Sequence, residues 1–125
     1  MKIIQTNKAP AAIGPYSQAI EANKLIFTSG QIALNEKGEF VEGDVTIQTK
    51  QVMKNLKEIL KQANSGLNQV VKTTCFLANM EDFAAFNAEY EKAFKGHKPA
   101  RSTIAVKTLP KNALVEVEVI ATKKK

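Results

Sequence analysis

The spacing of apolar residues predicts two amphipathic helices. Between Thr46 and Asn64 apolar residues recur mostly at intervals of three and four, which marks one buried stripe, and Gly66 suits a C-terminal cap. In the second segment, Asn79 with Asp82 three residues later resembles the start of a helix. Its predicted buried stripe consists of Phe83, Phe86, Tyr90 and Phe94.

Strands are predicted where β-branched and alternating residues are concentrated. Turns are expected around residues 35–38, where a hairpin would form, and at residues 110–112, between the last two strands. The resulting order is ββαβαββ. The predicted strands are Met1–Thr6, Leu25–Ser29, Val70–Leu77, Arg101–Val106 and Leu114–Thr122.

The last strand predicts how the layers are arranged, because its residues alternate between two kinds of surface. The face expected to lie beneath both helices is entirely apolar. Two helices on one side leave the other side of the sheet uncovered, and Leu114 and Ile120 would be exposed there unless a second copy buries them. A homo-oligomer is therefore expected. The apolar face comprises Val115, Val117, Val119 and Ala121, and the mixed face comprises Leu114, Glu116, Glu118 and Ile120.

The length of 125 residues predicts a single α+β domain spanning residues 1–125. Residues 1–12 lack the apolar core of a signal peptide, and no apolar run is long enough to cross a bilayer, so a soluble cytoplasmic protein is expected. One cysteine and one histidine cannot form a disulfide or a usual zinc site, and no metal is expected.

The net charge of +6 raises the possibility of a nucleic-acid partner. The lysines are scattered from Lys2 to Lys111, the only run is residues 123–125, and aromatic residues are few. A nucleic-acid partner is therefore not favoured, although it stays open as an alternative.

Arg101 is the first candidate for chemistry, since it is the one arginine among 18 basic residues. A guanidinium forms two parallel hydrogen bonds to a carboxylate, which a lysine ammonium cannot copy. The alternative is a structural pair between Arg101 and a glutamate. Glu116 could approach Arg101 across the strand ladder or across a subunit boundary and orient a water molecule, or it could be a solvated strand residue.

Other candidates are weaker. A pair of catalytic carboxylates, Glu116 with Glu118, is disfavoured because the chain has no Trp and two Tyr for a sugar cleft. Cys75 is expected to be a small buried residue, and His97 lacks the partners of a catalytic triad. No glycine-rich phosphate loop occurs, so no nucleotide cofactor is indicated.

Three segments together are similar to the RidA family, also called YjgF, of imine deaminases. The similarity continues through Lys72-Thr73-Thr74 and through residues 83–90, which include Asn87, so that it spans essentially the whole chain. The segments are Ala9–Gln18 (APAAIGPYSQ), Thr28–Ile32 (TSGQI), and Pro99–Thr103 (PARST) with Leu109-Pro110-Lys111 and Val115–Glu118 (VEVE).

This resemblance implies a chorismate-mutase-like fold and a homotrimer with its active sites between subunits. It also implies hydrolysis of 2-iminobutanoate and 2-iminopropanoate to 2-keto acids and ammonia, which clears damaging metabolites without a cofactor or metal. Carried over by position, Arg101 would bind the substrate carboxylate and Glu116 would hold the attacking water. Substrate contacts are expected at Tyr16, Ser29, Gly30, Asn87 and Thr103.

Thr103 is a departure, since many members have cysteine there. A contact made by the backbone amide would survive this change, whereas thiol reactivity would be lost. Two other functions stay open: an endoribonuclease or translation inhibitor, and a non-catalytic regulatory trimer that binds small ligands.

Overall fold

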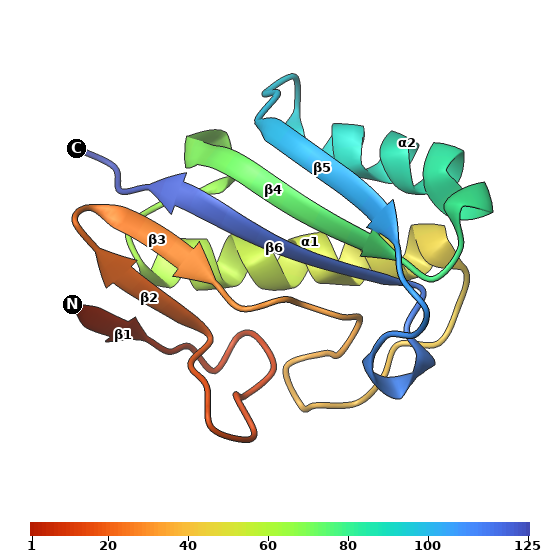
Figure 1. Ribbon diagram of the computed structural model, residues 1–125. Helices are drawn as coiled ribbons and strands as arrows, with labels where there is room; N and C mark the ends of the chain where they lie inside the picture. Colours follow the sequence, from red (N-terminus) through yellow and green to blue (C-terminus); the bar gives the residue numbers. More distant parts are fainter.

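In the computed structural model, which describes residues 1–125, one six-stranded sheet organises the chain (Figure 1). The strand order is β1-β2-β3-β6-β4-β5, in which β4 and β5 run parallel and all other neighbours are antiparallel. The strands are β1 (Lys2–Ile4), β2 (Ala19–Ala22), β3 (Leu25–Thr28), β4 (Val70–Leu77), β5 (Ala100–Ala105) and β6 (Val115–Thr122). The helices are α1 (Val45–Gln62) and α2 (Phe83–Phe94), with short 3₁₀ turns at Leu67–Gln69, Met80–Asp82 and Pro110–Asn112.

Both helices lie on the same side of the sheet, behind it in the view of Figure 1. The predicted apolar face of β6 is buried beneath them, with all four side chains at most 2% exposed. They pack against Leu56, Ile59 and Phe86 of the helices in one core. The α+β class and the mixed sheet with helices on one face are thus confirmed.

The helix boundaries are set by residues that the sequence pattern only partly identified. Asp44 caps α1, where its Oδ1 accepts a hydrogen bond from the amide of Ile47 at 3.0 Å. At the other end Asn64 takes the left-handed conformation (φ +57°), so the predicted cap at Gly66 was wrong. Asn79 caps the 3₁₀ turn that precedes α2 rather than α2 itself.

The N-terminal part contains a strand that the sequence analysis missed. β2 pairs with β3 in a hairpin whose turn, Asn23-Lys24, has positive φ at both residues. The turn expected at residues 35–38 is present, since the amide of Gly38 donates to the carbonyl of Asn35 at 2.9 Å, but it joins only an isolated bridge between Leu34 and Phe40 and not two strands of a hairpin.

The last two strands are not neighbours, because β4 lies between β5 and β6. Arg101 therefore lies beside Thr73 of β4, while Glu116 lies beside Phe76 on the other edge of the same strand. An approach of Glu116 to Arg101 across one ladder, which the sequence left open, does not occur.

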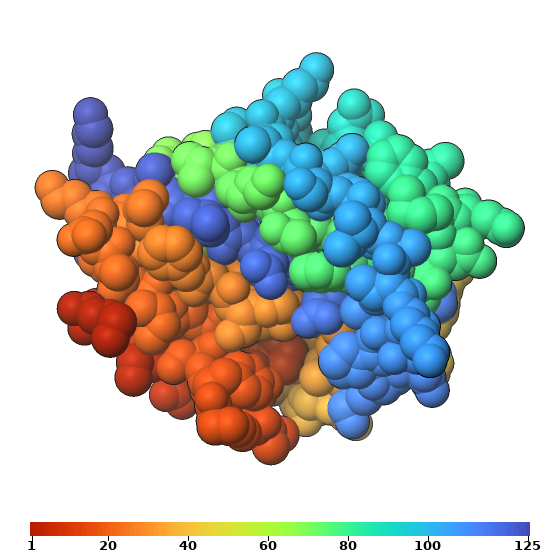
Figure 2. Space-filling model, viewed as in Figure 1, coloured from red at the N-terminus to blue at the C-terminus, as the bar shows by residue number.

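The uncovered face of the sheet carries an apolar row across four strands. Ile3, Ile20, Phe27 and Ile120 follow one another through the pairing of β1, β2, β3 and β6. Phe27 is 41% exposed and Ile3 is 66% exposed, and no other part of the chain covers these strands in Figure 2. Leu114, in contrast, packs against the core, so its predicted exposure on this face was wrong. No helix combines the length and apolar character needed to cross a bilayer.

Buried carboxamides attach the loops to this framework. Asn55 of α1 donates to the carbonyls of Ile32 and Leu34, and Gln48 accepts from the amide of Leu114. Gln18 holds the N-terminal loop, because it accepts from the amide of Thr6 at 2.7 Å and donates to the carbonyls of Thr6 and Pro10. Each amide thus satisfies backbone groups that would otherwise be buried without partners.

We expect Gln18→Ala to lower the free energy of unfolding by about 1–3 kcal/mol, because it leaves a buried amide and two carbonyls unpaired. Urea unfolding measures this change. Gln62→Ala, which removes an exposed carboxamide at the end of α1, is the matched control and should change stability by less than about 0.5 kcal/mol. Equal effects of the two substitutions would contradict the role given to Gln18.

Candidate active site

Arg101 lies on β5, the edge strand, and its side chain is directed toward α2. Its Nη1 donates to Oδ1 of Asn87 at 2.6 Å. The guanidinium carbon lies 4.9 Å from the centre of the Tyr90 ring and 5.4 Å from that of Phe83. The Tyr90 hydroxyl is itself held by Thr73 at 2.8 Å, so both the hydrogen bond and the ring contacts fix the orientation of the guanidinium.

The guanidinium has no carboxylate partner. The one ion pair of the chain joins Lys123 to Glu21, so the structural arginine–glutamate pair considered from sequence does not exist. Asn87 takes one donor, and no other side-chain or backbone acceptor bonds to the guanidinium. A half-buried cation with free donors on a planar fork is suited to bind an anion of carboxylate geometry.

Thr103 and Cys75 lie beside each other on β5 and β4, two residues along from Arg101. The Thr103 hydroxyl is buried beside the Cys75 thiol. Cys75 is fully buried, and burial raises the pKa of its thiol, an effect that Thr73 and the charge of Arg101 partly offset. Cys75 is therefore a structural residue, as the sequence indicated, and the hydroxyl of Thr103 lies on the same face of β5 as Arg101.

Glu116 belongs to a second cluster, on the uncovered face of the sheet. Its carboxylate lies directly over Gly30, where a Cβ atom would come within 2.8 Å of Cδ of Glu116. A pair of backbone hydrogen bonds between Gln31 and Val117, of 2.9 and 3.1 Å, fixes this approach. Glycine is thus required at position 30 for the carboxylate to occupy this place.

The same packing changes the acidity of Glu116. Burial raises the pKa of its carboxyl group, and the nearby charge of Glu118 raises it further. Compared with the unfolded chain, the folded chain therefore favours the protonated form of Glu116. The stabilisation that this group contributes is present at acid pH and is lost as the pH rises through the raised pKa. A raised pKa makes the Glu116 carboxyl group a better proton acceptor than an ordinary surface glutamate.

Ser29 and Tyr16 complete the second cluster. The Ser29 hydroxyl donates to the carbonyl of Ser17 at 2.6 Å, and its amide donates to the carbonyl of Gln18 at 2.9 Å. These bonds hold the loop before β2 against the residues that follow β3. Tyr16 lies in that loop and is 53% exposed, free to contact a ligand or another chain.

The predicted site residues therefore form two groups on opposite faces of one sheet. Arg101, Asn87 and Thr103 lie on the helix side, because Arg101 and Thr103 share the face of the buried residues Thr73 and Cys75. The second group is Glu116 with Gly30 on the open side, next to Ser29 and the loop that carries Tyr16. Within one chain the arginine and the glutamate do not meet.

Sequence reasoning assigned Phe83 and Tyr90 to the core and missed their contact with Arg101. The signal was present, because Phe83, Asn87 and Tyr90 are spaced by four and three residues and share one face of α2. Three side chains on that face surround one guanidinium. The described residues contain no group of three or more His, Cys, Asp or Glu side chains that could hold a metal ion.

A family model described as Endoribonuclease L-PSP matches residues 6–123. The 2-iminobutanoate/2-iminopropanoate deaminase of Mus musculus is 50% identical over 121 residues, which cover 96% of this chain and 90% of the mouse protein. The chain belongs to the RidA (YjgF) family.

Two further members of the RidA family show how much of the chain is shared. A Lactococcus lactis protein named as a regulator, AldR, is 57% identical over 122 residues, which cover 97% of each chain. The crystal structure of TdcF from E. coli with bound serine is 36% identical, with a TM-score of 0.94 and coverage of 99% of this chain and 100% of TdcF. The fold is thus shared over its full length.

We expect Gly30→Ala to displace the Glu116 carboxylate toward solvent while the chain stays folded, because the added methyl group meets the flexible end of that side chain. The pKa of Glu116 should then fall toward the ordinary glutamate value, which carbon-13 NMR titration of the carboxyl groups measures. Gly66→Ala is the control, because its methyl group would meet Asn68 and Lys124 instead. An unchanged Glu116 pKa in Gly30→Ala would show that the two residues are not in contact.

Proposed function

We propose that the protein is a hydrolytic deaminase of reactive 2-imino acids and their enamine forms, with 2-iminobutanoate and 2-iminopropanoate as substrates. The observation that carries this proposal is the uncompensated guanidinium of Arg101, which has free donors for a small carboxylate. The mouse relative, half identical over nearly the whole chain, is named for these two substrates. The products are the 2-keto acid and ammonia.

In this mechanism Arg101 holds the substrate carboxylate by two parallel hydrogen bonds and so fixes the position of the neighbouring imine carbon. Water adds to that carbon, Glu116 accepts the proton that the water loses, and the proton passes to the nitrogen. Glu116 then takes the proton of the new hydroxyl group and delivers it to the amine, so that the carbon–nitrogen bond breaks and ammonia leaves as the carbonyl forms. General acid–base catalysis of this kind raises a reaction rate by about 10²- to 10⁴-fold. This modest gain suits an imine, because its carbon is already electrophilic. The steps require no cofactor and no metal.

The two groups of site residues would meet between subunits of a homotrimer. An edge strand that carries Arg101 is free to dock beside the open face of a second copy, where Glu116 and Gly30 lie. The exposed apolar row on that face would be buried in the same contact. We place this trimer in the cytoplasm.

Two alternatives have specific support. The Lactococcus relative is named as a regulator, and the free donors of Arg101 could bind a 2-keto acid without turnover. The family model is named for an endoribonuclease, an activity that would show steep salt dependence and depend on surface lysines. A threonine dehydratase coupled to this protein separates these functions, because only a deaminase accelerates the appearance of keto acid.

We expect Arg101→Lys to lower kcat/KM for imine hydrolysis by about 10- to 100-fold, because a point charge replaces a pair of charge-assisted hydrogen bonds. The coupled dehydratase assay measures the loss. Lys98→Arg, an exposed exchange three residues away, is the control and should leave the rate unchanged. Wild-type turnover by Arg101→Lys would remove the carboxylate grip from the mechanism.

Mixing two inactive variants tests the shared site. Arg101→Ala and Glu116→Gln should each be nearly inactive, yet trimers reassembled from an equal mixture should regain activity, because about a quarter of the clefts would combine two intact halves. The control mixes Arg101→Ala with Arg101→Lys, in which no cleft gains an intact arginine. The same coupled assay follows both mixtures. Recovery absent from the first mixture, in trimers shown by mass spectrometry to be mixed, would refute a site built from two subunits.

A further inference from the structure

A groove of about 750 Å³ lies on the helix side of the molecule, between α1 and the C-terminal end of α2. We call it the lysine groove, after the six lysines that line it. Its inner wall includes the buried side chains of Met53 and Phe94. The lining lysines, all with exposed side chains, are Lys50, Lys54, Lys57, Lys61, Lys95 and Lys124.

Four of these lysines form a straight row along α1. Their spacing of four, three and four residues keeps them on one face of the helix, over a length of about 16 Å. Like charges at these spacings repel one another and weaken a helix. The charges of this row therefore do not stabilise α1.

The positive charge of the groove is almost uncompensated. None of its lysines forms an ion pair, and Glu89, 7% exposed, is the one acidic residue that lines it. Six cations and one carboxylate thus account for most of the net charge of +6. The sequence suggested scattered lysines, whereas the fold gathers a third of them in one place.

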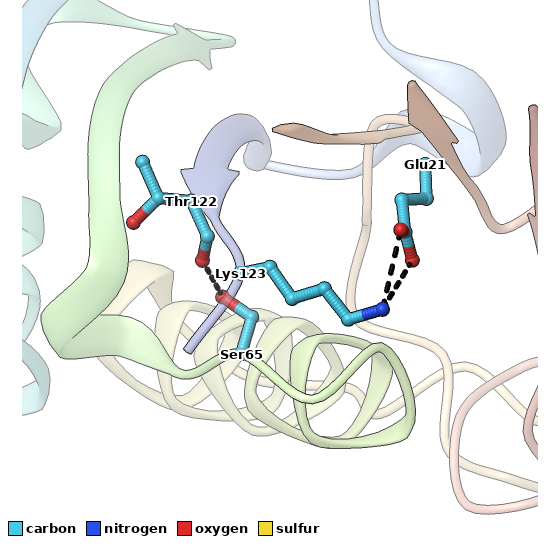
Figure 3. Close-up of polar contacts among 4 residues, drawn as sticks. All are labelled: Glu21, Ser65, Thr122 and Lys123. Atoms are coloured by element: carbon cyan, nitrogen blue, oxygen red, sulfur yellow. Dashed lines mark hydrogen bonds and ion pairs between the residues drawn. The ribbon is translucent and has the colours of Figure 1, made fainter. Parts of the chain in front are cut away.

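The C-terminal segment is fixed so that it contributes to the groove. The hydroxyl of Ser65 donates to the carbonyl of Thr122 at 2.7 Å, and Lys123 pairs with Glu21 at 3.2 Å on the side away from Ser65 (Figure 3). The amide of Lys124 then donates to the carbonyl of Asn64 at 2.9 Å. The Lys124 side chain is thereby held over Gly66, at the end of the α1 row.

We propose that the lysine groove binds a linear chain of phosphates linked by anhydride bonds, such as inorganic polyphosphate. Lysine is a compact point charge that attracts phosphate without demanding a fixed geometry, and the groove has no arginine to recognise carboxylates in pairs. A row of about 16 Å exceeds the reach of one small anion and suits an extended one.

Bases of a nucleic acid would find no platform in this groove. The Phe94 ring is 4% exposed, and the His97 ring is committed to the carbonyl of Val70 at 2.6 Å and lies against Phe94. Binding of single-stranded nucleic acid usually adds stacking on exposed aromatic rings to its phosphate contacts. The chemistry of the groove is therefore that of phosphate alone.

The groove is separate from the candidate active site. Glu89 and Ala93 direct one face of α2 into the groove, while Asn87 and Tyr90 on another face contact Arg101. The groove also lies on the helix side, so an assembly through the open sheet face leaves it accessible. Phosphate-chain binding thus neither requires nor depends on deaminase activity.

The test measures fluorescence anisotropy of end-labelled inorganic polyphosphate, longer than the row, on the full-length protein. We expect the triple variant Lys54→Gln, Lys57→Gln, Lys61→Gln to bind at least about tenfold more weakly, and the slope of log affinity against log salt to fall by about two. Lys2→Gln, Lys8→Gln, Lys37→Gln removes the same charge from exposed positions outside the groove and should bind like the wild type. Glutamine retains helix propensity, and circular dichroism and the deaminase assay verify that both variants are folded.

Competition identifies the ligand. Unlabelled polyphosphate should displace the probe far better than tripolyphosphate or a nucleoside triphosphate at equal phosphate concentration, because these are too short for the row. Equal loss of affinity in both triple variants would show a non-specific charge effect and overturn the proposal. So would tighter binding of single-stranded RNA or of an acidic peptide than of polyphosphate in the same competition.

Discussion

The proposed function depends on a half-buried guanidinium that lacks a counter-ion. Burying a cation is costly unless a hydrogen-bonded or charged partner compensates it. In this chain one amide oxygen and two aromatic rings hold Arg101 in place, and none of them neutralises it. The fold thus maintains a positively charged and oriented fork whose natural complement is an anion from outside the chain.

The sheet imposes the second constraint, because a strand presents successive residues to opposite sides. Helices cover the side with Arg101, and the side with Glu116 stays open with its apolar row. A chain arranged in this way keeps Arg101, the proposed anion-binding group, and Glu116, the proposed proton-transfer group, on opposite faces of its own sheet. Assembly would then join the two functions and bury the apolar row in the same contact.

The sequence predicted most of the fold where burial is periodic, as in α1 and in the valine alternation of β6. It missed β2, since Ala19-Ile20-Glu21-Ala22 is short and contains weak strand formers, and since its turn at Asn23-Lys24 has no glycine. The residues of the site were named from family resemblance and from the singular arginine. The sequence placed Glu116 on the face away from the helices, but the face of Arg101 could not be predicted, because β5 has no buried stripe and its register beside β4 is a long-range property. The lysine groove was missed for the same reason, as it joins segments from three parts of the chain.

The pairing of Thr103 with buried Cys75 has a consequence for the chemical durability of the protein. The single thiol, on Cys75 of β4, is buried in the core. The neighbouring position on β5, on the same face as Arg101, carries the hydroxyl of Thr103. Molecules that alkylate proteins react first with accessible thiolates. Because the one cysteine is fully buried, the folded chain presents no thiolate to such reagents, and they reach it only when the core opens.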